Sequence, residues 1–162
     1  MDRPEGFPDV RWGHQPGPLV LKPMEAFVAS RLGSWCLRRL RPRRFTVFGP
    51  IGVPLLLLTT TGRNTGRRRQ TPLICMREGE RLFIIGTNFG QAVHPEWSAN
   101  LLADHDAWVT MGGKDIPVTA TPLHGAEKER VYAMFEAYNA KVYGSYRSRT
   151  DREPRVFALT RR

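Results

Sequence analysis

Apolar residues in this chain gather in short runs separated by glycines and charged residues, a pattern that favours strands over long helices. The run at 53–60 is nearly continuous and predicts a buried strand. The other strands are predicted as two hairpins, around Glu78-Gly79 and Gly112-Gly113, followed by one last strand. These five segments are 69–77, 81–87, 107–111, 115–121 and 156–160.

Two longer segments, 24–40 and 126–140, repeat their apolar residues at helical spacing and predict amphipathic helices. A short helix is predicted to begin at Pro95-Glu96 and to run to 102. The remaining segments are predicted as an irregular proline-rich arm and two loops. These are 1–23, 88–94 and the Tyr- and Arg-rich stretch after 140.

Antiparallel hairpins with interspersed helices indicate an α+β fold, and neighbouring hairpins suggest a barrel or a roll. We expect a proline-rich arm with a basic amphipathic helix at 1–45, and one barrel domain at 46–162. At 162 residues, 41% of them hydrophobic, the chain is long enough to bury a core. The sequence shows no internal repeat.

The cysteines and the N-terminus favour a cytoplasmic location. Cys36 and Cys75 match no disulfide framework, as is usual for reduced thiols in the cytoplasm. No apolar run is long enough to cross a bilayer, and the N-terminus lacks the pattern of a secretory signal. The four histidines lack metal-ligand spacing, so we expect no metal site.

A formal net charge of +10 predicts attraction to an anion, for which nucleic acid, a membrane surface and a phosphorylated cofactor are candidates. Four arginines lie within 63–69, in a glycine-containing turn that follows the buried strand. Glycines free backbone N–H groups to face a ligand, and guanidinium groups bind phosphate or carboxylate. The turn lacks the Lys-Ser/Thr pair of a Walker loop, and a solvated hairpin tip is the alternative interpretation.

Three blocks of sequence, in order, resemble one family. The first is 56–73, which reads LLLTTTGRNTGRRRQTPL, and the second is 87–90 followed by PEWSANL at 95–101. The third is Tyr143 and Tyr146 ahead of the Thr-Asp-Arg run at 150–152. Together they resemble the deazaflavin (coenzyme F-420)-dependent nitroreductase and quinone reductase family.

The resemblance implies a split β-barrel similar to the FMN-binding fold, with coenzyme F-420 in a groove along it. The implied reaction is hydride transfer from the reduced deazaflavin to a quinone or a nitro compound. The protein's part is to supply position and electrostatics. Tyr143 and Tyr146 would line the acceptor side and donate a hydrogen bond or a proton, while Thr87 would hold the ring.

The coenzyme-binding residues that the resemblance implies fall into three groups: the turn for the phosphate and carboxylates, the following strand for the ring, and 87–90 for the ring edge. They are Thr59, Thr61, Arg63, Asn64, Thr65, Gly66, Arg69, Pro72, Leu73, Ile74, Thr87, Asn88, Gly90, Trp97, Asn100 and Tyr143. Asn64 and Asn88 stand where relatives commonly have lysine, and Arg67 and Arg68 are extra cations that could compensate. Ile74 replaces an aromatic residue of some relatives, which leaves the acceptor open.

The basic segment 24–44 has three interpretations: it packs on the barrel, mediates a homodimer, or lies on the anionic inner face of the cell membrane. Two alternatives to the enzyme remain at this point. One keeps the barrel but binds FMN or haem. The other is a nucleic-acid-binding domain supported by charge alone, and no motif of that class is present, so we expect no nucleic-acid partner.

Overall fold

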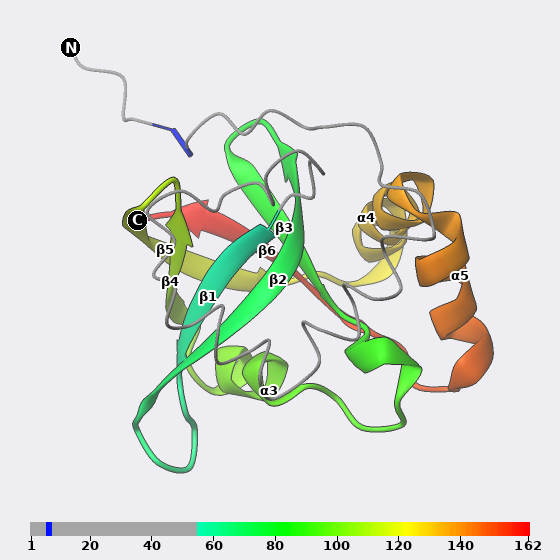
Figure 1. Ribbon diagram of the computed structural model, residues 1–162, viewed down its shortest axis with the longest axis horizontal. Coiled ribbons are helices and arrows are strands. Elements are labelled where there is room, and N and C mark those ends of the chain that lie inside the picture. Colours follow the sequence, from blue (N-terminus) through cyan, green and yellow to red (C-terminus); the bar gives the residue numbers. More distant parts are fainter. Residues whose placement is uncertain (1–5, 8–54) are drawn as a thin grey trace.

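A computed structural model of the chain describes residues 6–7 and 55–162 (Figure 1). The predicted helix at 24–40 and the start of the first predicted strand lie outside the described residues, and so does nearly all of the predicted arm. Within that arm, Phe7 differs from the prediction of an irregular, unpacked segment. Its side chain is buried in the barrel core, and its carbonyl accepts a hydrogen bond of 2.9 Å from Nη1 of Arg77.

Six antiparallel strands close into a barrel in the order β1-β2-β3-β6-β5-β4. Their bounds are β1 Leu55–Thr61, β2 Arg68–Glu78, β3 Arg81–Gly86, β4 Asp106–Met111, β5 Lys114–Pro122 and β6 Arg155–Arg161. All six lie within one or two residues of the predicted strands wherever the chain is described. The predicted α+β barrel is therefore confirmed.

Strand β3 is buried on both faces, which explains why its sequence is apolar without alternation. Leu82 and Ile84 point into the barrel, and Phe83 and Ile85 between them pack outward in a second cluster. This second cluster lies under two helices that cover one side of the barrel, α4 (Gly125–Tyr138) and α5 (Ala140–Arg149) (Figure 1). The barrel thus has an inner core and an outer one.

The loop predicted after residue 140 is wrong, because the segment forms α5. Asn139 caps the N-terminus of this helix, and its side chain accepts a hydrogen bond of 3.2 Å from the Val142 amide. Tyr146 lies one helical turn after Val142 and Tyr143, and all three side chains pack in or against the outer core. Tertiary burial of this face outweighs the low helix propensity of Gly144 and the serines.

Two short helices complete the described fold. Helix α3 (Glu96–Ala103) begins where the sequence predicts and lies across one end of the barrel (Figure 1). A single 3-10 turn, η2 (Asn88–Gly90), lies within the predicted loop at 88–94. In the part of the chain that the structure describes, no helix is both long and apolar enough to span a bilayer.

Candidate active-site groove

The turn between β1 and β2 folds back on itself through its own amides. The amides of Thr65 and Gly66 donate to the Gly62 carbonyl at 3.0 and 2.7 Å, and that of Gly62 donates to the Arg67 carbonyl at 2.8 Å. A Cβ at Gly62 would lie 2.8 Å from Thr65 Oγ1 and 3.1 Å from the Arg67 carbonyl oxygen, so this position requires glycine. Sequence reasoning expected these amides to face a ligand; instead they hold the turn together.

Asn100 of α3 fixes the turn with two hydrogen bonds. Its buried side chain accepts a hydrogen bond of 3.1 Å from the Arg63 amide and donates one of 3.1 Å to Oγ1 of Thr60. With the amides engaged in this way, anion recognition at the turn rests mainly on side chains. The arginines therefore matter more than the glycines for any charged ligand.

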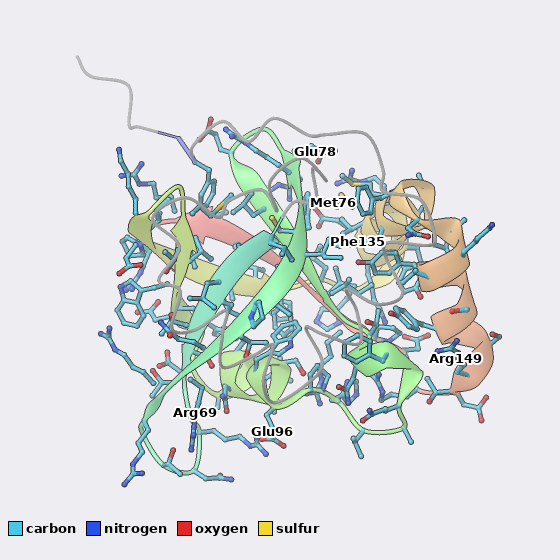
Figure 2. All side chains as sticks on the ribbon, viewed as in Figure 1. Arg69, Met76, Glu78, Glu96, Phe135 and Arg149 are labelled. Atoms are coloured by element: carbon cyan, nitrogen blue, oxygen red, sulfur yellow. The ribbon has the colours of Figure 1, made fainter. Side chains whose placement is uncertain are left out.

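A cavity of about 440 Å³ opens beside the turn, and its walls include the charged side chains of Arg63, Arg69 and Glu96. Its walls are Gly62, Arg63, Asn64, Thr65, Arg69, Gln70, Thr71, Glu96, Trp97 and Asn100. Arg63 reaches over to Glu96 at the start of α3, with 2.5 Å between Nη1 and the carboxylate. The hydrogen bond and charge of Arg63 lower the pKa of Glu96. Figure 2 shows Arg69 and Glu96 at this end of the barrel.

Arg68 points to another part of the surface. Its guanidinium lies 4.4 Å from the ring centroid of Trp108 on β4, in cation–π geometry. Neither Arg67 nor Arg68 lines the cavity beside the turn. The suggestion that these two arginines compensate for Asn64 finds no support in this arrangement.

A second cavity, of about 270 Å³, continues along β2. Its walls are Thr71, Pro72, Leu73, Ile85, Gly86, Thr87, Asn88, Phe89, Pro95 and Trp97. It shares Thr71 and Trp97 with the charged cavity. Trp97 is buried and packs on Phe157 with 5.9 Å between ring centroids, which anchors the wall between the two cavities.

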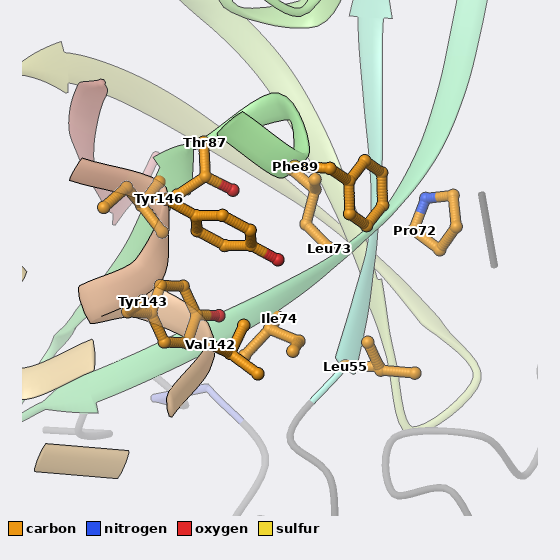
Figure 3. Close-up of a pocket in the computed structure, with 10 residues that line it drawn as sticks. Leu55, Pro72, Leu73, Ile74, Thr87, Phe89, Val142, Tyr143 and Tyr146 are labelled. Carbon is orange, nitrogen blue, oxygen red and sulfur yellow. The ribbon is translucent and has the colours of Figure 1, made fainter. Parts of the chain in front are cut away.

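The third cavity, of about 120 Å³, is mostly apolar and ends at a pair of tyrosines. Its walls are Leu55, Pro72, Leu73, Ile74, Ile85, Thr87, Phe89, Val142, Tyr143 and Tyr146. Both phenol rings reach in from α5 toward Leu73 and Ile74 (Figure 3). The rings of Tyr143 and Tyr146 meet edge to face, 5.8 Å apart. The backbone beneath them is held by the buried Tyr132 hydroxyl, which donates to the Tyr143 carbonyl at 2.9 Å.

Neighbouring cavities share wall residues, so we describe the three together as one groove, and its polarity follows the order of residues in β2. Arg69 lies at the charged end, Pro72 and Leu73 in the middle, and Ile74 at the tyrosine end. The five residue-to-residue steps from Arg69 to Ile74, at about 3.3 Å each, give a length of about 17 Å for this part of the groove. The groove therefore suits an elongated ligand with an anionic end and a flat apolar end.

Residues 87–89 form the side wall of the groove, and two of them have a costly backbone conformation. Asn88 and Phe89 have φ of 47° and 55°, and Gly90 follows at 75°. A residue other than glycine in this region costs on the order of 1–3 kcal/mol and persists only where the surroundings hold it. The φ of 75° favours glycine at position 90, and a Cβ there would lie 3.0 Å from Cδ of Arg149, whose side chain would have to move.

Most of the residues implied by the resemblance line this groove. They are Arg63, Asn64, Thr65, Arg69, Pro72, Leu73, Ile74, Thr87, Asn88, Trp97, Asn100, Tyr143 and Tyr146. Four do not line it: Thr59, Thr61, Gly66 and Gly90. Thr59 is buried and accepts a hydrogen bond from Gln70, and Gly66 has the positive φ of 62° that the turn requires.

Several residues of the groove were missed from sequence, among them Phe89, Ile85, Val142 and Glu96. Phe89 could have been found, since it lies between two expected site residues, Asn88 and Gly90. Val142 could not, because it belongs to α5, where the sequence predicts a loop. In the described residues no group of histidine, cysteine and acidic side chains is arranged to hold a metal ion.

Residues 30–161 match the sequence model of the F420H(2)-dependent quinone reductase family. The chain belongs to this family. An F420H(2)-dependent quinone reductase of Mycobacterium tuberculosis is 37% identical over 115 residues, which are 70% of this chain and 77% of the relative. A solved F420H2-dependent reductase is 32% identical, with a TM-score of 0.59, over 65% of this chain and 93% of the other.

Two more solved structures extend the comparison. One, described as a domain-swapped dimer, is 32% identical with a TM-score of 0.60, and the match covers 65% of this chain and 79% of the other. HutZ, the haem storage protein of Vibrio cholerae, has a TM-score of 0.51 at 12% identity, over 67% of this chain and 81% of HutZ, which shows a shared fold alone. Family membership makes the chain an oxidoreductase with coenzyme F420.

Proposed function

We propose that the groove along β2 binds coenzyme F420 lengthwise and presents it to a quinone at the tyrosine end. The observation that carries this proposal is the change in polarity along the groove. Arg63 and Arg69 line its charged end, and Tyr143 and Tyr146 line its mostly apolar end. The family is F420H(2)-dependent. The donor set fits such a ligand, because guanidinium groups suit phosphate and carboxylates while Pro72 and Leu73 offer an apolar floor for a flat ring.

Reduced F420 supplies the hydride when it is bound, and the residues of the groove do the rest. Negative charge develops on the quinone oxygen as the hydride arrives, and a preorganised donor lowers its energy. Tyr143 and Tyr146 carry phenol O–H donors and line the end of the groove at which we place the acceptor. The apolar walls formed by Leu55, Ile74 and other side chains exclude water, which strengthens each of these hydrogen bonds.

A titration of the protein with F420, followed by absorbance, tests the binding mode. We expect saturable binding that weakens with salt, and a dissociation constant raised about tenfold or more in Arg63→Ala/Arg69→Ala, which loses two charge-assisted contacts. Arg161→Ala is the matched control, because this exposed arginine lies at the end of β6 and lines none of the three cavities. Absence of saturable binding at low salt would refute the proposed site.

Turnover separates the candidate acceptors. Oxidation of reduced F420 is followed with a short-chain quinone and, in parallel, with a nitroaromatic compound. We expect the quinone to be the better substrate, in line with the family. A clear preference for the nitro compound would contradict this part of the proposal.

We also infer that the chain forms a homodimer. Its support is the solved domain-swapped dimer, which is 32% identical to this chain. Light scattering on a sizing column is expected to give twice the mass of the 18.5 kDa chain. A monomer at micromolar concentration would contradict this inference.

A further inference from the structure

The side wall of the groove belongs to a short segment, 86–94, whose internal hydrogen bonds join its own residues and not the barrel. Thr87, Asn88 and Phe89 face the groove, and two of them have the positive φ that residues with a Cβ avoid. Within the loop, Nδ2 of Asn88 donates to the Val93 carbonyl at 2.9 Å. That bond closes the far side of the loop but does not fix its position against the barrel.

Arg152, which comes between α5 and β6, supplies that fixation. Its guanidinium makes four contacts with the loop: Nε with the Gln91 carbonyl at 3.0 Å, Nη1 with the Gly86 carbonyl at 3.2 Å and His94 Nδ1 at 2.8 Å, and Nη2 with the Thr87 carbonyl at 2.7 Å. None of these acceptors is a carboxylate. The planar fork of donors is thus used for its geometry rather than to neutralise an acid.

The contact with His94 adds a constraint on the loop. Arginine has no acceptor and stays protonated, so Nδ1 of His94 must be the acceptor and the imidazole must be neutral. Burial is the main cause that lowers the pKa of His94, and the charges of Arg155, Arg152 and Lys128 lower it further. Both ends of the loop, Gly86-Thr87 and Gln91-His94, are therefore tied to one side chain.

We propose that Arg152 is a positioning residue for the hydride-transfer reaction, and that its guanidinium sets the side wall of the coenzyme groove by clamping 86–94. This inference rests on the proposed function, since the wall matters only if the coenzyme lies against it. Loss of the clamp lets Thr87 and Phe89 leave the groove. A misplacement of about 1 Å is enough to reduce an enzymatic rate about 10²-fold.

The first test needs no coenzyme. Hydrogen exchange is measured on the 87–94 amides of the wild type, Arg152→Ala and Arg152→Lys, with Arg81→Ala as the matched control. Arg81 is another arginine with an engaged guanidinium, held by Glu127 at 2.7 Å, but it lines none of the three cavities. We expect faster exchange at 87–94 in both Arg152 variants and no change there in Arg81→Ala. Unchanged exchange in Arg152→Ala would overturn the clamp by itself.

The second test adds F420 and a quinone. We expect kcat/KM to fall about 10²-fold in Arg152→Ala, and millimolar ethylguanidinium to restore part of it, because the cation replaces the missing fork. Sodium chloride at equal ionic strength should not do so, and Arg152→Lys should stay impaired because one ammonium cannot reach all four acceptors. Full activity of Arg152→Ala, or failure of both variants to fold, would overturn a positioning role. If the wild type itself does not bind F420, the proposed function fails, whereas the exchange result on the clamp stands.

Discussion

The carboxylate of Glu96 lies 2.5 Å from Nη1 of Arg63, at the charged end of the groove. An anionic ligand that binds Arg63 must compete with this carboxylate, which α3 holds at its first turn. We therefore predict that Glu96→Gln binds F420 more tightly, by about two- to fivefold, the range typical of exposed ion pairs. Glu127→Gln, which breaks the remote pair with Arg81, is the control and should leave the dissociation constant unchanged. Weaker binding in Glu96→Gln would show that Glu96 helps the ligand instead.

Removing either phenol hydroxyl at the other end of the groove tests the acceptor chemistry. We predict that Tyr143→Phe and Tyr146→Phe lower kcat, by about 10²-fold for whichever tyrosine is the main donor, because a preorganised donor to developing charge is lost. The dissociation constant of F420 should change little. Single-turnover oxidation of the reduced coenzyme by a quinone measures the effect. Wild-type rates in both variants would remove the tyrosines from the mechanism.

Tyr138 on α4 provides a matched tyrosine control and a prediction of its own. In the part of the chain described here, its buried hydroxyl has no hydrogen-bond partner, and burial is the main cause that raises its pKa. Tyr138→Phe removes an unsatisfied polar group, so the melting temperature should stay equal or rise slightly. A clear drop in melting temperature would show that the hydroxyl has a partner in solution.

The buried Tyr132 hydroxyl connects the two covering helices, α4 and α5, through the Tyr143 carbonyl. We predict that Tyr132→Phe loses about 1 kcal/mol of stability, which is about 2–4 °C in melting temperature for a chain of this size. It should also lower kcat more than it raises KM, because α5 carries the tyrosine pair. Calorimetry and steady-state kinetics measure the two effects, and an unchanged kcat would contradict the connection to α5.

The neutral His94 predicts a pH dependence. Its pKa in the folded protein lies below the usual value near 6.5, so the folded state resists protonation. Stability is then full above pH 6.5 and falls as the pH drops from that value through the folded pKa, since the unfolded chain takes up the proton first. His94→Gln retains an acceptor for Arg152 and should flatten this part of the melting-temperature profile. An unchanged profile in His94→Gln would assign the pH dependence to another group.

The strands of this fold could be predicted from sequence because each buries apolar side chains in the inner core or in both cores. Leu82 to Ile85 alternate between the inner and outer clusters, so every position is apolar and the segment stands out. Helix α5 could not be predicted, because its few apolar residues and its glycine and serines resemble a loop until the outer core is known. Helix formation there depends on tertiary packing.

The same distinction holds for the groove. The order of residues from Arg69 to Ile74 was visible in the sequence, and it became the order of the cavities along β2. The hydrogen-bond partners of the turn amides could not be predicted. Two of these amides bond to the Gly62 carbonyl, and that of Arg63 bonds to Asn100, 37 residues away in the chain. The role of Arg152 could not be predicted for the same reason. Its hydrogen-bond partners precede it in the chain by between 58 and 66 residues.

The place of β6 in the barrel has a consequence for biosynthesis. This strand is the last described element, yet it pairs with both β3 and β5. Until residues 155–161 have left the ribosome, those two neighbours keep open hydrogen-bonding edges, which can pair with other nascent chains. Closure therefore waits until β6 has been synthesised, and a copy that stops short of β6 is expected to be a substrate for chaperones and proteases rather than an enzyme with reduced activity.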